Sequence, residues 1–484
     1  MAKSSPSFQI TAPTSQFERG ELLGLFLVGL GSLALLVAWV GAGGLAPWAL
    51  LLLSTAAFSG GGYLYFKRHL SRPAGIDNDG LMFSSSTMRG AVGWVLGVIF
   101  TGVYVLLYFF PSTLTGLIEM TDPLSEIIRG READEWFMYG FLYTLAVLVM
   151  GVRMFIKYRH STYQIIRTAS VMFFQLGFAF LLPGLLQLFN QPEFYFHYFW
   201  PLEHTYLFPS TVDFFTDTTR LGVFMIFWGG LMTFVATPLL TYFYGKRWYC
   251  SWVCGCGGLA ETAGDPFRHL SDKSLKAWQI ERWMVHGVLA IIAVGTAILW
   301  INSAMEGGLL GGFSNAFASA YGFYVGAIFS GVIGIGFYPI MGNRVWCRFG
   351  CPMAAILGLF QRFYSRFRIT TNNAQCISCG NCSTYCEMGI DVRWYAQRGQ
   401  NIIRSACVGC GICAEVCPRG VLKLENGPRE GRFNGPVLND GEYAYVDPDE
   451  SWADPVAGDG ARTKAGQEVF IGEDIPVLSD DDWK

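Results

Sequence analysis

The sequence predicts an α-helical integral membrane protein of about eight transmembrane helices, followed by a small cysteine-rich α+β domain. Of its 484 residues, 52% are hydrophobic and only 15% are charged, whereas about a quarter of the residues of a soluble protein are charged. All thirteen cysteines lie between Cys250 and Cys417. The first observation places the chain in a bilayer, and the second indicates that the cysteines are there for chemistry.

Eight uncharged runs are long enough to cross a membrane. A bilayer core about 30 Å thick needs about 20 apolar residues in a helix. Pro183 and Pro238 lie inside two runs, but a helix bundle tolerates proline because neighbouring helices satisfy the backbone groups that it frees. The predicted spans are 22–40, 47–66, 91–110, 136–156, 169–189, 221–244, 283–301 and 321–340.

The positive charges between the runs predict the orientation, because cytoplasmic loops are enriched in lysine and arginine. With a cytoplasmic N-terminus, the outer loops contain only Arg129, Arg131 and Arg220. The inner loops contain Lys67, Arg68, Arg72, Arg89, Lys157, Arg159, Arg167, Lys246, Arg247, Arg268, Lys273, Lys276 and Arg282. We therefore expect a multi-pass protein of the bacterial inner (cytoplasmic) membrane, with both termini and every cysteine cluster on the cytoplasmic side. Arg153, near the inner end of its span, is expected to snorkel to the interface.

The domain organisation follows from these runs and from the composition. We expect a polar lead (1–20), an N-terminal membrane domain of about five spans (21–220), a second membrane domain of about three spans (221–369), a cysteine-rich domain (370–425) and an acidic tail (426–484). The tail is either solvated or a docking segment, and both interpretations stay open. The net charge of −3, without a polybasic segment, excludes nucleic acid as a partner.

Two cysteine strings carry the most specific signal. Each has the spacing Cys-x-x-Cys-x-x-Cys-x-x-x-Cys of a bacterial ferredoxin, in which the fourth cysteine of each string binds the cluster of the other. This spacing argues against a disulfide framework and against a structural zinc site. The first string has Glu387 where the second has Pro418. The prediction is two [4Fe–4S] clusters, one bound by Cys376, Cys379, Cys382 and Cys417, and the other by Cys407, Cys410, Cys413 and Cys386.

Two further cysteine pairs follow the ends of predicted spans. Cys250/Cys254 and Cys347/Cys351 occur in matching segments, each with glycine, arginine and an aromatic residue before the first cysteine. A spacing of four would place both thiols of a pair on one helix face, so that two pairs form a cage of four thiolates with Cys256 as an alternative ligand. Three interpretations stay open: an additional metal or iron–sulfur centre near the membrane, redox-active thiols, or structural cysteines.

The remaining polar residues suggest no further cofactor. Only His286 among the six histidines clearly lies within a span, so haem is not expected. No flavin is expected either. His197 and His204 lie in an aromatic outer segment, where an interfacial aromatic belt is favoured over a quinone site. Glu261 and Asp265 follow the first pair and either support that site or solvate a loop.

Between residues 221 and 425 the sequence resembles the NapH/NosR/CcoG group of membrane-bound polyferredoxins. The resemblance is carried by two Cys-x-x-x-Cys-Pro motifs at helix ends, of which the first has Gly255 in place of proline, and by the two ferredoxin strings. It implies electron transfer between the quinone pool and a redox partner. The flavin-binding domain of the NosR kind, and the later span and outer domain of the CcoG kind, are not recognised.

The function expected from these features is membrane-bound electron transfer through iron–sulfur clusters, without catalytic acid–base residues. The partners would be other subunits of a respiratory or related redox complex, quinone or quinol, and a soluble electron carrier. Whether the chain is itself an enzyme, for example a quinol dehydrogenase, stays open. The alternatives are a reductase of metal ions such as copper that assists metalloenzyme assembly, and a redox sensor.

Overall fold

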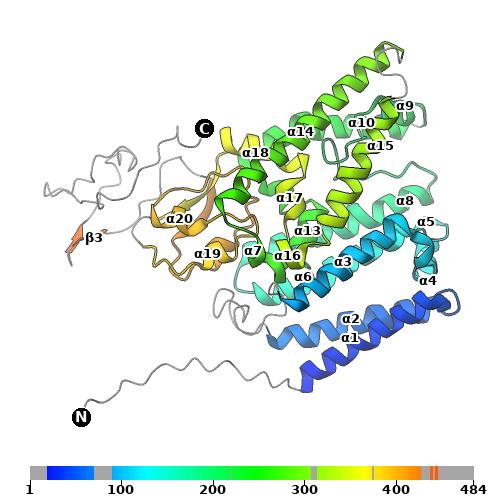
Figure 1. Cartoon of the computed structure of the whole chain (residues 1–484), viewed down its shortest axis with the longest axis horizontal. Coiled ribbons are helices and arrows are strands. Elements are labelled where there is room, and N and C mark those ends of the chain that lie inside the picture. Colours follow the sequence, from blue (N-terminus) through cyan, green and yellow to red (C-terminus); the bar gives the residue numbers. More distant parts are fainter. Residues whose placement is uncertain are drawn as a thin grey trace.

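The computed structural model describes residues 19–69, 90–218, 220–306, 313–372, 375–426, 437–439 and 442–444. Nearly all of the predicted polar lead (1–20) and of the acidic tail (426–484) lies outside these residues. In Figure 1 a bundle of long helices carries the cysteine-rich domain, with α19 and α20, at one of its ends.

All regular elements in the described part of the chain up to Leu188 are helices. Gly24 and Gly61 face each other across α1 and α2, where a Cβ on Gly24 would lie 2.7 Å from the carbonyl oxygen of Gly61. The absence of both side chains lets these two helices pack closely as an antiparallel pair. The elements are α1 (Arg19–Val37), η1 (Ala38–Ala42), α2 (Pro47–His69), α3 (Ala91–Phe109), η3 (Pro111–Leu114), α4 (Thr115–Glu119), α5 (Asp122–Arg129), α6 (Glu135–Lys157), α7 (Thr162–Phe173), η4 (Phe174–Leu181) and α8 (Leu182–Leu188).

The second membrane part contains the helices that lead to the cysteine pairs. Pro183 and Pro238 each begin a new α-helical segment directly after a π-helical one, so the π turn absorbs the hydrogen bond that proline cannot make. The elements are α9 (Pro209–Thr218), α10 (Arg220–Leu231), η5 (Met232–Ala236), α11 (Thr237–Tyr244), α12 (Arg247–Cys250), α13 (Gly255–Glu261), η6 (Asp265–Leu270), α14 (Leu275–Ala304), α15 (Phe313–Tyr321), η7 (Gly322–Ile333), α16 (Tyr338–Met341), α17 (Val345–Phe349) and α18 (Pro352–Phe363).

Six helical stretches within the described residues are long and apolar enough to cross a bilayer. They are Arg19–Gly41, Glu135–Lys157, Thr162–Leu188, Arg220–Tyr244, Leu275–Ala304 and Ala316–Ile333. A seventh is added if the helix pair Gly93–Phe109 and Pro111–Glu119, bent by 113°, is one span. The predicted multi-pass helical membrane protein is therefore confirmed, whereas the count of eight stays a prediction.

The C-terminal domain closes on itself through a small antiparallel sheet. β1 (Phe367–Thr371) precedes the first cysteine string and β2 (Leu422–Asn426) follows the second, and Ile369 pairs with Leu424. Its short helices are α19 (Asn381–Thr384), α20 (Val392–Gln397) and α21 (Ile412–Glu415), and a second hairpin is formed by β3 (Val437–Asn439) and β4 (Glu442–Ala444).

Membrane part and cysteine-rich domain share one hydrophobic core. Its buried members include Leu357 from α18, Phe367 from β1 and Val408 from the second string, together with Cys250 and Cys347. Both kinds of cysteine motif are therefore packed against each other rather than held on separate bodies.

Candidate iron–sulfur sites

The two ferredoxin strings fold as structural repeats. Ser378 and Gly380 in the first string have φ angles of 58° and 82°, and Gly409 and Gly411 at equivalent positions of the second have 64° and 81°. Residues in the left-handed region turn successive backbone N–H groups toward one side, which forms an anion-binding concavity. Each string thus wraps its cysteines around a common centre.

Four cysteines from both strings line one pocket of the domain. The structure brings Cys376, Cys379 and Cys382 of the first string together with Cys417 of the second. Cys379 is exposed and Cys382 is buried. Burial raises the pKa of Cys382 to about 12, so its thiol is protonated near neutral pH unless iron displaces the proton.

The other four cysteines lie deeper, against the membrane part. Cys407 and Cys413 are buried, while Cys410 and Cys386 are half-buried. Burial raises the pKa of Cys413, and the neighbouring thiolates of Cys410, Cys407 and Cys386 raise it further, which shows that the four groups face one another. Both predicted sets of four are therefore brought together, and their binding of clusters stays a prediction.

Side chains of the membrane part hold the second string by its backbone. Ser251 donates a hydrogen bond to the carbonyl oxygen of Val408 (2.8 Å), Tyr163 to that of Gly409 (3.0 Å), and Gln164 to that of Cys410 (2.9 Å). Three successive carbonyl groups are thus satisfied from outside the domain, which positions the second set of cysteines relative to the bundle.

The two membrane-proximal pairs also fold as repeats. Gly245 (φ 67°) ends α11 and Gly342 (φ 93°) ends α16, and each is followed by a short helix that carries the first cysteine. The second cysteine of each pair precedes the next helix, with its backbone N–H 2.9 Å from the carbonyl oxygen of Tyr249 or Trp346. The matching sequence segments therefore adopt matching backbones.

The expectation that each pair shares one helix face is wrong. Cys250 ends α12 and Cys254 precedes α13, and the same break separates Cys347 from Cys351. Pro352 begins α18, and proline cannot continue a helix from the preceding turn.

The four thiols nevertheless gather in one buried place. Cys250, Cys254, Cys347 and Cys351 belong to the same core cluster. Burial raises the pKa of Cys250 to about 12, with Cys254 and Cys347 as its neighbouring thiolates. A hydrogen bond from Cys256 lowers the pKa of Cys254 to about 7, so this thiol is the most readily ionised of the group.

Groups of four thiols are the ligand set that a [4Fe–4S] cluster requires. Among the described residues, no three His, Cys, Asp or Glu side chains converge closely enough to bind one metal ion. In a [4Fe–4S] cluster each thiolate binds a different iron, so its four sulfur ligands stand further apart than those of a single tetrahedral ion. The convergent buried thiols and the backbone concavities fit iron–sulfur clusters, which would supply one-electron redox chemistry at these places.

Asp265 is a buried ion-pair partner, and the interpretation that it solvates a loop is wrong. It contacts Arg153, accepts a hydrogen bond from Lys157 (2.9 Å) and another from Arg268 (3.1 Å). Burial alone would raise its pKa, but Lys157, Arg153 and Arg268 together hold it well below the usual value. The expectation that Arg153 snorkels is also wrong, because Asp265 offers it a partner inside the protein.

Glu261 is buried in the same region, so the solvated-loop interpretation is wrong for it too. It pairs with Arg167 and with Arg344, whose Nη2 lies 2.6 Å from its Oε1. Arg344 also pairs with Glu387. The sequence did not single out Arg167, Arg268 or Arg344, although Arg344 lies inside the repeated segment and Glu387 replaces the ferredoxin proline.

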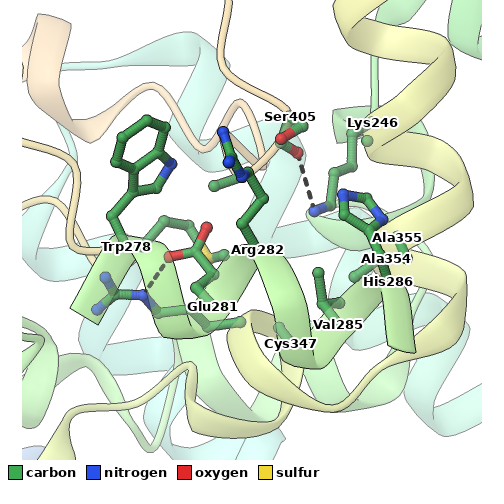
Figure 2. A pocket seen from close by; sticks show the side chains of 14 residues that line it. Lys246, Trp278, Glu281, Arg282, Val285, His286, Cys347, Ala354, Ala355 and Ser405 are labelled. Atoms are coloured by element: carbon green, nitrogen blue, oxygen red, sulfur yellow. Dashed lines mark hydrogen bonds and ion pairs between the residues drawn. The ribbon is translucent and has the colours of Figure 1, made fainter. Parts of the chain in front are cut away.

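A pocket opens beside Cys347, between α14, α18 and the cysteine-rich domain (Figure 2). Lys246 donates to the carbonyl oxygen of Ser405 (3.2 Å), and Arg348 donates to Glu281 (2.5 Å). The Nδ1 atom of His286 is buried without a hydrogen-bond partner. The charged residues that line the pocket are Lys246, Glu281, Arg282 and Arg348.

The two histidines of the outer segment pack among aromatic rings. The ring centroid of His197 lies 4.0 Å from that of Tyr198, and that of His204 lies 4.9 Å from that of Tyr321. Burial lowers the pKa of His197 to about 3, so it is neutral at physiological pH. Both histidines therefore pack against aromatic side chains of the protein, and the aromatic belt stays a prediction.

Family comparisons match both kinds of cysteine motif. The family described as "4Fe-4S binding domain" matches residues 226–274 and 323–370, which contain the two membrane-proximal pairs. The family described as "4Fe-4S dicluster domain" matches residues 368–418, which contain both strings.

Individual proteins match about a third of the chain. YccM of Escherichia coli, provisionally named an electron transport protein, is 28% identical over 172 residues, or 34% of this chain and 46% of its own. The ferredoxin-type methylamine utilisation protein MauN of Paracoccus denitrificans is 29% identical over 166 residues, or 31% and 53%. An uncharacterised protein of Methanocaldococcus jannaschii is 24% identical over 168 residues, or 34% and 59%.

The chain thus spans about half the length of the curated relatives it matches. No solved structure is significantly similar to it. The two ferredoxin-type domains, the named relatives and the apolar helices fit a membrane-bound polyferredoxin, as the resemblance of the sequence implies.

Proposed function

We propose that the chain conducts single electrons from the membrane-proximal cysteines, through the second ferredoxin set, to the first set and its surface. The observation that carries this proposal is the order of the three cysteine groups. Cys410 of the second set lies beside the charged groups that surround Cys347, and Cys382 of the first set is a neighbour of Cys413. Cys379 is exposed at the other end.

The membrane-proximal cysteines would hold a third iron–sulfur centre, in addition to two [4Fe–4S] clusters. Three observations favour this over free thiols or structural cysteines: four thiols converge, the family match covers both pairs, and Arg344 donates toward the Cys347 sulfur (3.7 Å). A buried guanidinium beside a sulfur atom stabilises a thiolate, and thiolates are the form that binds metal.

The proposed electron donor is quinol, and the proposed acceptor is a soluble carrier or another subunit of a redox complex. The pocket beside Cys347 is lined by three permanent cations against one carboxylate, Glu281. This charge repels a metal cation but not a neutral quinol, so it favours quinol oxidation over metal-ion reduction. Because the loops around the cysteines are rich in lysine and arginine, we place this end of the bundle in the cytoplasm of a bacterial cell.

Iron and acid-labile sulfide analysis with EPR tests the number of centres. Purified wild-type protein is compared with a Cys250→Ser/Cys347→Ser variant under anaerobic conditions. We expect about eight irons in the variant, as two cubanes hold four each, and an excess over eight in the wild type. Equal iron content in both proteins would exclude the third centre.

Proteoliposomes test the donor. Quinol added to oxidised protein should reduce the clusters, and reduction should be lost in the double variant. Reduction by quinol that is unaffected in the variant would mean that electrons enter elsewhere. Turnover with copper ions but not with quinol would favour the metal-reductase alternative.

A further inference from the structure

A chain of charged side chains connects the membrane-proximal cysteines to the second ferredoxin set. Arg344 Nη1 lies 3.7 Å from the sulfur of Cys347, and its Nη2 lies 3.0 Å from Oε1 of Glu387. The other oxygen of Glu387 lies 3.1 Å from Arg268 Nη1, which is 3.9 Å from the sulfur of Cys410. We call Arg344, Glu387 and Arg268 the charge bridge.

The charge bridge belongs to a buried network of ion pairs. The charged groups that these ion pairs connect are Arg153, Lys157, Arg167, Arg268 and Arg344 with Glu261, Asp265 and Glu387, and all eight are buried. Buried guanidinium groups are costly unless they are paired and hydrogen-bonded, so the N–H groups of Arg268 and Arg344 that these carboxylates leave unbonded need further anionic neighbours.

The two arginines point to where those anions stand. Nε of Arg344 and Nη2 of Arg268 are buried without a hydrogen-bond partner, although each guanidinium lies beside a cysteine sulfur. Clusters held by thiolates carry net negative charge, and hydrogen bonds to their sulfurs are among the factors that set their potentials. Iron–sulfur centres on both sides would therefore place an anionic group beside each of these arginines.

We propose that the charge bridge sets the reduction potentials of the two iron centres that it joins, with Arg344 and Arg268 raising them and Glu387 lowering them. Reduction adds a negative charge to a cluster, and a nearby buried cation stabilises that charge, whereas a carboxylate opposes it. The part that concerns Arg344 depends on the proposed third centre. The part that concerns Arg268 needs only the second ferredoxin set.

This proposal also accounts for Glu387, the residue that departs from the ferredoxin pattern. Its carboxylate joins both guanidinium groups, accepts a hydrogen bond from Asn343 (3.3 Å) and is only 1% exposed. Proline at this position, as in the second string, could not join the two arginines.

The test is an EPR-monitored redox titration of the full-length protein in nanodiscs. Arg268→Gln should lower the equilibrium constant for reduction of the Cys407/Cys410/Cys413/Cys386 centre at least tenfold, which is about 59 mV for one electron. Glu387→Gln should raise the equilibrium constant for reduction of the same centre. Arg268→Lys, which keeps the charge, should recover most of the wild-type potential.

The controls distinguish an effect of charge on the reduction potential from an effect on folding. Arg366→Gln removes an exposed arginine, whose charge is screened by solvent, and should leave every midpoint unchanged. If Arg268→Gln does not assemble its clusters, the midpoint potentials of Glu387→Gln and Arg268→Lys still test the proposal. Only a charge effect gives the predicted combination, a raised potential in Glu387→Gln and a potential close to that of the wild type in Arg268→Lys. An unchanged midpoint potential in Glu387→Gln would overturn the proposal. Shifts of the same sign in Arg268→Gln and Glu387→Gln would overturn it as well.

Failure of the proposed function gives a different pattern. If the third centre is absent, the signal that Arg344→Gln should shift does not exist, whereas the opposite shifts of the second ferredoxin centre persist. If the charge bridge has no effect, all signals are present and none moves.

Discussion

The hydroxyl group of Ser251 donates a hydrogen bond to the carbonyl oxygen of Val408 over 2.8 Å, and the bond is buried. Ser251 lies inside the pair Cys250/Cys254, and Val408 directly follows Cys407. One hydrogen bond therefore joins the backbone of the second ferredoxin string to the loop between two membrane-proximal cysteines, so that the two sites keep a constant separation.

Ser251→Ala should loosen the docking of the second string. The carbonyl group of Val408 loses the hydrogen bond that it accepts, and a buried group without its partner costs about 1–3 kcal/mol. We expect faster hydrogen exchange at residues 407–413, about tenfold for each 1.4 kcal/mol. Ser32→Ala is the control, since Ser32 bonds only the carbonyl of Val28 in its own helix. Equal protection in both variants would contradict the prediction.

An iron chelator should remove the first ferredoxin cluster before the second. Cys379 of the first set is exposed, whereas Cys407 and Cys413 of the second are buried under the membrane part. We expect two phases of iron loss by EPR, and the fast phase should disappear in Cys379→Ser, which already lacks a ligand of the first cluster. Simultaneous loss of both signals would show that burial does not protect the second cluster.

Cys256 should not be a ligand of the third centre. Cys250 and Cys254 have counterparts in Cys347 and Cys351, whereas the position that corresponds to Cys256 in the second segment is Met353. Cys256→Ala should therefore keep the iron that Cys250→Ala loses. Iron analysis of the two single variants decides this, and equal losses would make Cys256 the alternative ligand instead.

Asp265→Asn should destabilise the protein strongly. Arg153, Lys157 and Arg268 would lose a shared buried carboxylate, and removing one partner of a buried ion pair costs about 3–5 kcal/mol. We expect a clearly lower melting temperature in detergent. Arg131→Gln, which removes an exposed partner of Asp134, should cost less than about 1 kcal/mol. Similar melting temperatures for the two variants would refute the prediction.

Asp265 also gives the stability a pH dependence of definite sign. Its pKa in the folded protein is lower than in the unfolded chain, because three cations stabilise the carboxylate. Its contribution to the free energy of unfolding is fully present above the usual pKa of about 3.9 and is lost as the pH falls through the lowered value. Thermal melts at decreasing pH should show this loss in the wild type but not in Asp265→Asn.

Particular residues show how far the sequence could predict the site. The cysteine spacing predicted which thiols of the two strings come together, because in a bacterial ferredoxin the fourth cysteine of each string binds the cluster of the other. The same reasoning misjudged the membrane-proximal pairs: a spacing of four suggested one helix face, but Gly245, Gly342 and Pro352 break the helices there. The buried role of Asp265 was not predictable, since two of its three partners, Arg153 and Lys157, come from α6, which is distant in the sequence.

The sequence by itself determined the helical membrane class, the ferredoxin domain and the grouping of its eight cysteines, because hydrophobic length and ligand spacing are local properties of the chain. Only the tertiary structure decided that both cysteine pairs meet in one buried place, and that Arg344 and Arg268 join this place to the second ferredoxin set through Glu387. Such contacts depend on which helix ends pack together, and no local pattern of residues encodes the partner of a buried charge.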